Sequence, residues 1–455
     1  MIRACRRLIE RAWGYYRLYG ARRFFWAVMA KTRQRLSPAS VRHDAVPPPP
    51  PPPPPSDDAQ SPAPTQWKRR STDPYQAFFD HWRVDTAIAR APNKVMRKPN
   101  VAIIGDLNLP QCKKYRVMQK LEAFASQGIG FHYSHYDDVP RAMNIMQMAT
   151  FVIFYRTHAS PTFDLLLNEC HRLGIPNAYD IDDPIFSEKI YSSNINLQHL
   201  DMIERNNLLA SAHSHYLAMR QCDTGIVSTP RLVSELRARG MNSVYLWRNA
   251  IDAETANAIA LAENDRKGTR PRTKRIRIVY ASGSRAHEAD FREISGVLTD
   301  VLKAHPGVTL HIIGYLELPK EFEPFENRII VEPFTDYATY IRRLAACDIS
   351  LVPLVRDDFN DCKSAIRYME AAQVQTPSVV SAIGDFVNII EDGVDGFLAE
   401  RPQDWAKAIN KLIASSKLRR SIGAAAREKT TRTLTVTGVF ETLDDELKAY
   451  IHGRY

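Results

Sequence analysis

Residues 357–386 read DDFNDCKSAIRYMEAAQVQTPSVVSAIGDF and contain the unit that decides the fold. Apolar side chains recur there at helical spacing, at Ile366, Met369 and Ala372. A short apolar run at residues 378–382 follows, and a Gly-Asp turn comes directly after it. The stretch therefore predicts a helix that opens near Cys362 and leads into a buried parallel strand.

The same alternation of strands and helices extends through most of the chain. In the first half, buried strands are predicted at VAIIGD (101–106), FVIFYR (151–156) and NAYDI (177–181). A second series begins with RIRIVYASGS (275–284) and continues through VTLHIIGYL, RIIVEPF, ISLVPLV and SVVSA. Alternating strands and helices form a parallel sheet that is covered on both faces. We therefore expect an α/β fold of two Rossmann-like, doubly wound domains that face a cleft, with ligands at the carboxyl ends of the strands.

Changes in composition predict the boundaries between the parts of the chain. Nine consecutive prolines, Pro47 to Pro55, predict a stiff polyproline spacer. The predicted parts are a basic amphipathic tail (1–36), a Pro-rich linker (37–74), a first domain with a leading helix (75–252, helix 75–89), a polar linker (253–274) and a second domain with closing helices (275–455).

The positive charge lies in the N-terminal tail. The net charge is +10, and residues 1–42 hold eleven Arg or Lys side chains and one acid, Glu10, so the remaining residues sum to zero. Nothing in the body therefore indicates a nucleic-acid groove. On a helix over residues 3–19, five arginines share one face, and apolar and aromatic residues such as Leu8, Trp13 and Tyr16 share the other, which is typical of a helix on an anionic membrane surface. Docking on a partner or on the body, and an organelle transit peptide, are the alternatives.

The compartment is predicted from the same tail and from the cysteines. The longest apolar run, residues 24–30, is too short to span a bilayer and lacks a cleavage site after it. The six cysteines show no CxxC or CxxH spacing, so neither a zinc site nor a disulfide framework is indicated. We expect a cytoplasmic protein that lies peripherally on the inner face of the plasma membrane.

Two strand-to-helix junctions in the second half have the composition of anion sites. Ser282, Gly283 and Ser284 turn tightly into a helix that begins near His287, and Arg285 adds positive charge. An ordinary strand-to-helix turn is the alternative. The GxGxxG and GxxxxGK[ST] motifs are absent, which argues against an oxidoreductase and a nucleotide hydrolase.

The second junction is the predicted helix opening at residues 362–364. Lys363 supplies a charge and Ser364 a hydroxyl beside the unpaired N–H groups of a first helical turn. Glu370 lies six residues after Ser364, deep enough to accept hydrogen bonds from a ribose while a pyrophosphate rests at the helix start. A salt bridge between Glu370 and Arg367 is the structural alternative.

Polar residues also follow two strands of the first half. Asp182 and Asp183 come directly after the strand NAYDI, where they could bind the hydroxyl groups of a ligand or act as a base on one of them. Helix capping and turn formation are the alternative. His158 follows the strand FVIFYR, with Arg156 two residues before it, and both are candidates to point into the cleft. A structural role is the alternative for His158.

Several motifs together resemble a known family. KSAIRYMEAA, TPSVVSAIGDF and the IEDGVDGFL turn (390–398) resemble the donor-binding half of GT-B glycosyltransferases of the retaining Glu-x7-Glu group, which is glycosyltransferase family 4-like. SGSRAH (282–287), FNDCKS (359–364) and YDIDD (179–183) resemble motifs of its bacterial surface-polysaccharide branch. The likeness covers about residues 99–430.

The resemblance implies a nucleotide-diphosphate sugar donor on the second domain, a glycan or lipid-linked glycan acceptor on the first, and no metal or other cofactor. By position, Glu370 corresponds to the second Glu of the motif, the ribose ligand, and Tyr115 and Arg116 resemble an acceptor-side tyrosine-arginine pair. Cys362 stands where the first Glu is expected, which leaves the stereochemical outcome open. The candidates to replace that carboxylate are Asn360, Asp361 and Asp385.

We therefore expect a glycosyltransferase that acts in cell-surface polysaccharide biosynthesis. The expected catalytic residues are His158, Asp182, Asp183 and Lys363. The expected donor-binding residues are Ser282, Gly283, Ser284, Arg285, His287, Asn360, Lys363, Ser364 and Glu370. A non-catalytic GT-B-like scaffold, suggested by Cys362, and a metal-dependent GT-A-like transferase that uses the DIDD run are the alternatives.

Overall fold

The structure is a computed structural model that describes residues 98–199, 201–269, 275–283 and 287–454. The basic tail, the Pro-rich linker and the helix predicted at residues 75–89 lie outside the described residues. Among the described helices, none is long and apolar enough to cross a membrane.

The first domain contains a six-stranded sheet whose neighbouring strands are all parallel. Its strands are β1 (Asn100–Gly105), β2 (Gly130–His135), β3 (Phe151–Tyr155), β4 (Asn177–Ile181), β5 (Thr224–Val227) and β6 (Val244–Leu246). They lie in the order β2-β1-β3-β4-β5-β6, so the direction of winding reverses between β1 and β3. Crevices at such a reversal are the usual ligand sites of open α/β sheets.

The connecting helices of the first domain start at sequence signals for capping. The elements are α3 (Pro110–Lys113), the π-helical turn η1 (Lys114–Met118), α4 (Gln119–Ser126), α5 (Val139–Met148), α6 (Pro161–Leu173), α7 (Glu188–Ser193), the 3-10 turn η2 (Ile195–His199), α8 (Met202–Gln221) and α9 (Pro230–Ala238). The side chains of Asp138, Ser160 and Thr229 each accept a hydrogen bond from the backbone of the first helical turn. Each of these three helices also begins with Pro in its first turn, where the missing N–H has no helical partner to lose.

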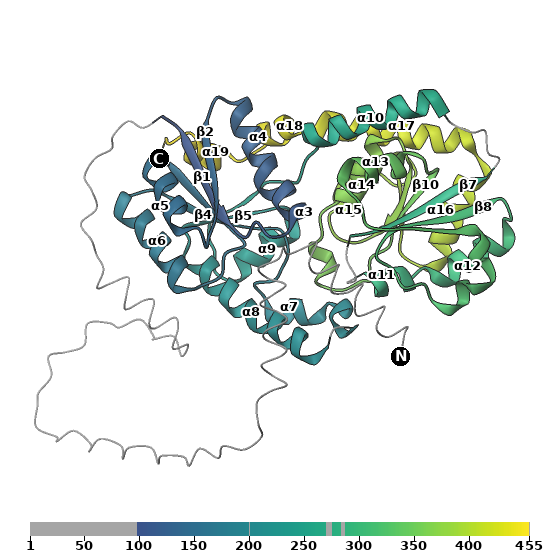
Figure 1. The fold of residues 1–455 in the computed structure, drawn as a ribbon, viewed down its shortest axis with the longest axis horizontal. Helices are drawn as coiled ribbons and strands as arrows, with labels where there is room; N and C mark the ends of the chain where they lie inside the picture. Colours follow the sequence, from purple (N-terminus) through teal and green to yellow (C-terminus); the bar gives the residue numbers. More distant parts are fainter. Residues whose placement is uncertain (1–97, 200, 270–274, 284–286, 455) are drawn as a thin grey trace, which may run out of the picture. The chain divides into compact units, whose positions relative to one another are not determined.

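The second domain repeats this architecture with a second parallel six-stranded sheet (Figure 1). Its strands are β7 (Ile276–Ser282), β8 (Val308–Gly314), β9 (Ile329–Glu332), β10 (Ile349–Val352), β11 (Ser378–Ser381) and β12 (Phe397–Ala399). Their order is β12-β11-β10-β7-β8-β9, with the reversal between β7 and β10. The prediction of two Rossmann-like domains is thus confirmed.

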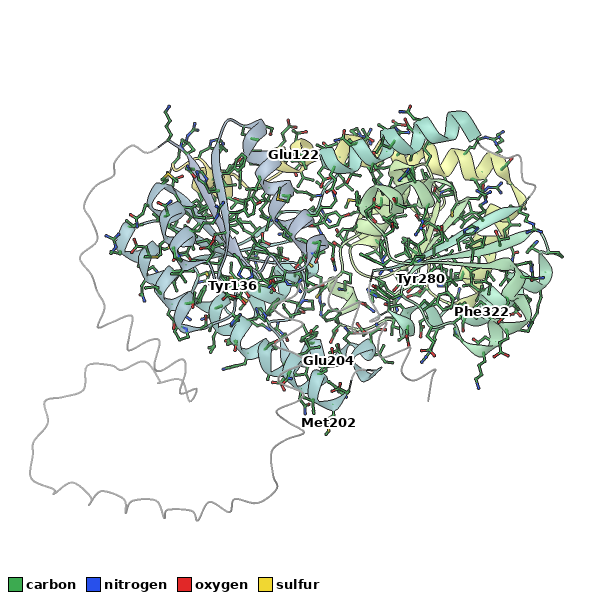
Figure 2. The ribbon with its side chains drawn as sticks, in the orientation of Figure 1. Glu122, Tyr136, Met202, Glu204, Tyr280 and Phe322 are labelled. Atoms are coloured by element: carbon green, nitrogen blue, oxygen red, sulfur yellow. The ribbon has the colours of Figure 1, made fainter. Side chains whose placement is uncertain are left out.

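The helices of the second domain cover both faces of its sheet. They are α11 (Glu288–Arg292), α12 (Ser295–Ala304), the 3-10 helix η3 (Lys320–Arg328), α13 (Tyr337–Ala345), the 3-10 turn η4 (Asn360–Cys362), α14 (Ile366–Gln373), α15 (Phe386–Ile389), α16 (Pro402–Ala414) and α17 (Ser416–Thr433). The labelled side chains Tyr280 and Phe322 are buried within this domain, whereas Met202, at the start of α8 in the first domain, is 76% exposed (Figure 2).

The helix predicted near Cys362 begins later than expected. Residues 360–362 form the turn η4, and α14 starts at Ile366. Lys363 has an extended backbone, with φ −70° and ψ 139°, so it lies in the link between the two elements. The N–H groups of the first turn of α14 therefore do not adjoin Lys363 in the way the sequence suggested.

Two further segments differ from the predicted boundaries. The predicted linker contains the helix α10 (Ala253–Thr269), which buries a strip at i, i+3, i+4 and i+7, namely Thr255, Ala258, Ile259 and Ala262. The three apolar members pack in one cluster with residues of α13 such as Ile341 and Leu344. At the other end, α18 (Val436–Glu441) and α19 (Asp445–Ile451) contact the first domain, where Phe440 packs on Trp247 and Tyr450 stacks on Phe151.

The two passages of the chain between the domains are bonded to each other. Ile251 and Thr435 form an isolated parallel bridge. The Ile251 N–H donates to the Leu434 carbonyl at 2.7 Å, and the Val436 N–H donates to the Ile251 carbonyl at 3.1 Å. The segment that leaves the first domain and the segment that returns to it therefore pass between the domains side by side.

A buried ionic network ties η1 to β4 inside the first domain. Arg116 donates to both carboxylate oxygens of Asp180, at 2.9 Å each, and Lys120 Nζ lies 2.7 Å from Asp180 Oδ2. All three side chains are at most 1% exposed. Burial and the adjacent Arg116 lower the pKa of Lys120 to about 7, although Asp180 opposes this shift.

The variant Asp180→Asn is expected to lose about 3–5 kcal/mol of stability, because it leaves two buried cations without their counter-charge. The measurement is urea unfolding followed by tryptophan fluorescence. Glu400→Gln is the control, since its partner Arg356 and Glu400 are both more than half exposed and such pairs contribute about 0–1 kcal/mol. A loss below about 1 kcal/mol in Asp180→Asn would contradict the expected importance of the network.

Close packing of α17 against α14 predicts a second stability effect. A Cβ atom on Gly423 would overlap the carbonyl oxygen of Gln375, a backbone atom that cannot move aside easily. Gly423→Ala should therefore cost about 1–3 kcal/mol in the same urea assay. Gly296→Ala is the matched control, because a Cβ atom on Gly296 in α12 would meet nothing within 4 Å. Equal stability of the two variants would refute this account of the packing.

Candidate functional site

Four charged side chains meet where strand ends of the two domains come together. Lys363, which follows β10, places Nζ 2.7 Å from Asp183 Oδ1, and Asp183 follows β4. Arg156 follows β3, and its Nη2 atom lies 3.2 Å from Asp183 Oδ2, while its Nε atom lies 3.7 Å from Asp182 Oδ1. We call Arg156, Asp182, Asp183 and Lys363 the charged cluster. It joins three of the residues predicted to be catalytic.

Arg156 reaches the charged cluster from an unusual backbone conformation. Its φ is +46°, in the left-handed region that costs a residue with a side chain about 1–3 kcal/mol. The guanidinium also donates to Cys112 Sγ at 3.0 Å. Such strain persists where the surroundings fix it, and it concentrates at functional sites.

The pKa values of the two aspartates of the charged cluster are shifted in opposite directions. Burial alone would raise the pKa of Asp183, but Lys363 and Arg156 lower it to about 2. Burial raises the pKa of Asp182, and this effect outweighs the opposing attraction of Arg156. Asp182 Oδ1 is buried and has no hydrogen-bond partner among the described residues. Asp183 is therefore a fixed anion, whereas Asp182 keeps an oxygen that is able to accept a proton.

The predicted donor residues His287 and Asn360 are both bonded to Asp290. Buried Asp290 lies 2.9 Å from His287 Nδ1, and it accepts hydrogen bonds from Asn360 Nδ2 at 3.1 Å and from the Val355 N–H at 2.9 Å. Burial lowers the pKa of His287. Asp290 is a residue that the sequence reasoning missed, although its position three residues after His287 at a helix start was a signal for such a contact.

The first predicted anion site is described only in part. Ser282 ends β7 and is buried, Gly283 is exposed, and α11 begins at Glu288, next to the predicted position. Ser284 and Arg285 lie outside the described residues.

In the second predicted site, Ser364 and Glu370 are held by side chains of the first domain. Asn249 Nδ2 donates to Ser364 Oγ at 3.0 Å. Glu370 is 7% exposed and accepts hydrogen bonds from the hydroxyls of Tyr115 at 2.5 Å and Tyr340 at 2.9 Å. Burial raises the pKa of Glu370, although these hydrogen bonds oppose the shift.

The alternative salt bridge between Glu370 and Arg367 does not form in the described structure. Arg367 Nη1 is instead buried without a hydrogen-bond partner among the described residues. Arg367 comes four residues after Lys363 in the chain, and besides burial the charges of both lower the pKa of His287. The Nη1 atom of Arg367 therefore remains available to donate a hydrogen bond to a ligand in the same region.

Cys362 occupies an apolar environment instead of a polar one. Its side chain is fully buried in the apolar core beside α9, and burial raises the thiol pKa to about 12. The proposed replacements for a carboxylate at this position are also engaged. Asp385 pairs with Arg248, Asp361 lies 3.5 Å from Arg231, and Asn360 is bonded to Asp290.

Arg248 and Asn249 were missed by the sequence reasoning. Both follow β6 directly, in the stretch LWRNAI, and both contact the loop between β10 and α14 or the one after β11. The signal was a polar pair at the end of a strand, the same signal that identified Asp182 and Asp183.

His158 follows Arg156 by two residues but makes no hydrogen bond to the charged cluster among the described residues. Its ring packs edge-on against Tyr136 at 5.3 Å and lies 6.3 Å from the ring of His215. Tyr136, labelled in Figure 2, belongs to the segment that follows β2. His158 is thus part of an aromatic group at the strand ends of the first domain.

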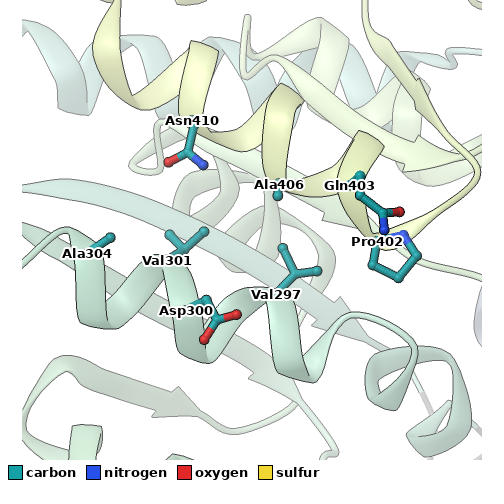
Figure 3. Close-up of a pocket in the computed structure, with 8 residues that line it drawn as sticks. All are labelled: Val297, Asp300, Val301, Ala304, Pro402, Gln403, Ala406 and Asn410. Carbon is teal, nitrogen blue, oxygen red and sulfur yellow. The ribbon is translucent and has the colours of Figure 1, made fainter.

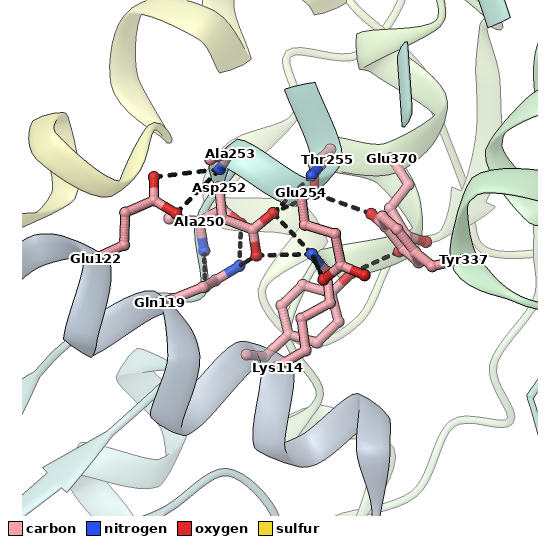
Figure 4. Close-up of polar contacts among 11 residues, drawn as sticks. Lys114, Gln119, Glu122, Ala250, Asp252, Ala253, Glu254, Thr255, Tyr337 and Glu370 are labelled. Atoms are coloured by element: carbon pink, nitrogen blue, oxygen red, sulfur yellow. Dashed lines mark hydrogen bonds and ion pairs between the residues drawn. The ribbon is translucent and has the colours of Figure 1, made fainter. Parts of the chain in front are cut away.

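Lys114 lies next to Tyr115 and to Tyr337, and Figure 4 shows it beside Tyr337 and Glu370. Its Nζ atom lies 2.7 Å from Asp252 and 2.9 Å from Glu254, and it sits 4.3 Å from the centre of the Tyr337 ring. The neighbours of Tyr115 on both sides, Lys114 and Arg116, are therefore each fixed by carboxylates.

No described group of three or more His, Cys, Asp or Glu side chains is arranged to hold a metal ion. A hollow of about 330 Å³ lies between α12 and α16, on the second domain (Figure 3). It is lined by residues such as Val297, Val301 and Ala406, and it includes none of the residues discussed above.

Comparisons with known proteins agree with this architecture. Residues 262–429 match the family of glycosyl transferases group 1. A D-inositol 3-phosphate glycosyltransferase from Geodermatophilus obscurus is 28% identical over 143 residues, which cover 28% of this chain and 31% of that protein. The match thus spans about a third of the length of this curated relative.

Two solved structures resemble the chain over most of its length. Sucrose-phosphate synthase from Thermosynechococcus elongatus is 13% identical with a TM-score of 0.53, and the match covers 78% of this chain and 98% of that one. HepE from Anabaena in complex with UDP-glucose is 16% identical with a TM-score of 0.50, over 77% of this chain and 99% of that one. The two domains thus have the fold of the GT-B glycosyltransferases, and residues 262–429 resemble the group 1 family in sequence as well.

Proposed function

We propose that the protein transfers a hexosyl or deoxyhexosyl group from a nucleotide-diphosphate sugar to a glycan or lipid-linked glycan acceptor, in the synthesis of cell-surface polysaccharide. The observation that carries this proposal is the charged cluster, which joins the strand ends of both domains beside their reversals of strand order. The complex of HepE with UDP-glucose supports a nucleotide sugar as the donor for a chain of this fold.

Lys363 is proposed to stabilise the charge that develops on the leaving diphosphate. Negative charge grows on the phosphate as the bond to the sugar breaks, so a fixed cation there lowers the barrier more than it lowers the energy of the bound donor. Arg367, whose Nη1 atom has no hydrogen bond among the described residues, and His287 are proposed to assist at the same phosphates. Glu370 would receive the ribose hydroxyls.

Asp182 is the better candidate than Asp183 for a base that takes the proton of the acceptor hydroxyl. Burial raises its pKa, and its Oδ1 atom accepts no hydrogen bond from the described residues, whereas Asp183 is held as an anion between Lys363 and Arg156. Environments that separate the acidities of two adjacent carboxyl groups are typical of an acid–base pair with distinct roles. We propose that the aromatic pair of His158 and Tyr136 contacts the acceptor sugar, a role that their adjacent rings would suit.

We propose that transfer is independent of a metal ion. In a GT-A-like site, the carboxylates of a DxD run neutralise a divalent cation. Here Asp182 and Asp183 face the cations Arg156 and Lys363, which already balance their charge. This arrangement favours side-chain cations at the diphosphate over the GT-A alternative.

A non-catalytic scaffold is the second candidate, and the environment of Cys362 favours it. A buried apolar thiol stands at the position where the family resemblance implies a sugar-contacting carboxylate. Sugar transfer or donor hydrolysis above background by the purified protein would eliminate this candidate.

Lys363→Ala should reduce kcat/KM by about a hundredfold or more, the usual loss for one charge contact in a transition state. The same variant should lose calorimetric binding of whichever of UDP, GDP and dTDP binds the wild type in the presence of EDTA. Lys303→Ala, which removes an exposed lysine of α12, is the control and should match the wild type. Activity of Lys363→Ala within threefold of the wild type, or binding that requires added Mn²⁺, would refute the assignment.

Deletion of residues 1–42 should abolish pelleting with anionic liposomes while activity on a soluble acceptor survives. The reason is that this segment holds eleven basic side chains and one acid, whereas the rest of the chain is neutral. Vesicles of neutral lipid are the control for the intact protein. Unchanged pelleting of the truncated protein would contradict the membrane proposal.

A further inference from the structure

The carboxylate proposed to bind ribose is already occupied by hydroxyl groups. Tyr115 donates to Glu370 Oε1 at 2.5 Å, and Tyr340 donates to Glu370 Oε2 at 2.9 Å. A ribose offers the same chemistry, since its two hydroxyls donate to the two oxygens of a carboxylate. The site therefore holds a pair of donors of the kind that its ligand would bring.

The two tyrosines come from different domains. Tyr340 lies on α13, in the same domain as Glu370, whereas Tyr115 lies on η1 of the first domain. Tyr340 therefore stays with Glu370 if the domains separate, and Tyr115 does not. A ribose that binds Glu370 has to take the place of the hydroxyl that is able to leave.

We propose that the Tyr115 hydroxyl occupies the position of a ribose hydroxyl on Glu370, so that nucleotide binding has to displace it, while Tyr340 remains and positions the carboxylate. This inference rests on the proposed function, because it takes Glu370 as the ribose ligand. It adds that the first domain competes with the donor for the donor's own site.

One other contact of the second predicted site shows the same substitution. The carboxylate of Asp183 lies on Lys363, where a phosphate oxygen of the donor is expected. The contact on Ser364 differs, because the amide of Asn249 donates to Ser364 Oγ, whereas a phosphate would accept a hydrogen bond from it. The tyrosine contact is the clearest of these, because a single hydroxyl is replaced by a single hydroxyl.

Movement of the Tyr115 side chain alone is restricted. On one side of it along η1, Lys114 is fixed by Asp252 and Glu254 (Figure 4). On the other side, Arg116 is fixed by Asp180. Tyr115 is 8% exposed, so its ring has little room to rotate away. Release of Glu370 therefore requires that the first domain moves away from α14, which couples donor binding to domain separation.

Two Tyr→Phe variants that each remove one hydroxyl from Glu370 should change nucleotide affinity in opposite directions. Tyr115→Phe removes the competitor and should tighten binding of the preferred nucleotide among UDP, GDP and dTDP by about tenfold, the effect of one hydrogen bond to a charged group. Tyr340→Phe removes the positioning contact and should weaken binding by about tenfold. Calorimetry on the full chain measures both dissociation constants.

Tyr368→Phe is the matched control, because Tyr368 also lies on α14 but its hydroxyl donates to the Asp395 carbonyl at 3.2 Å, away from Glu370. Its affinity should equal that of the wild type. Hydrogen exchange of residues 366–373 without nucleotide provides a second readout, which should accelerate in Tyr115→Phe and not in Tyr368→Phe.

The outcomes separate this inference from the proposed function. Nucleotide binding to the wild type that is unchanged or weaker in Tyr115→Phe overturns the competition while the donor site stands. Binding seen only in Tyr115→Phe supports the competition. If neither protein binds any of the three nucleotides, the donor site fails, and the competition fails with it.

Discussion

The buried contact between Arg116 and Asp180 is the interaction on which the rest of the site depends. It joins η1 to β4 with two hydrogen bonds of 2.9 Å inside the first domain. Arg116 is adjacent to Tyr115, and Asp180 precedes Asp182 and Asp183 by two and three residues. One ion pair therefore holds the segments of the first domain that contact Glu370 and Lys363 of the second. Removing one partner leaves an uncompensated charge in an apolar interior, which is far more costly than losing a surface pair.

The arrangement of two cations around two carboxyl groups determines the pKa values within the charged cluster. Two carboxyl groups and two cations are partly buried together, and the unequal sharing of the cations separates the acidities of Asp182 and Asp183. Under the proposed function, a phosphate that took the place of Asp183 on Lys363 would substitute one anionic partner of the lysine for another.

The parallel sheets were predictable because each buried strand is a short apolar run between helical stretches, and strand ends then located Asp182, Asp183 and Lys363. The helix α10 was not predicted, because its buried strip consists largely of small residues such as Ala258 and Ala262, and the segment around them is polar. The pairing of Tyr115 with Glu370 was also out of reach, since 255 residues separate the two and nothing local in either segment specifies its partner. The predicted start of the helix near Cys362 was imprecise for a related reason. Lys363 has an extended backbone between η4 and α14, and contacts with distant residues determine this conformation.

The paired passages at Ile251 and Thr435 have a mechanical consequence. The outgoing and returning segments are hydrogen-bonded to each other at one isolated bridge, so the two passages between the domains are joined at a single point. A joint of this kind can bend by changing a few backbone torsions, as hinges in other two-domain proteins do. Rotation about this point would change the angle between the domains while every ladder of both sheets stays paired, so the domains would open and close without any loss of their own folded structure.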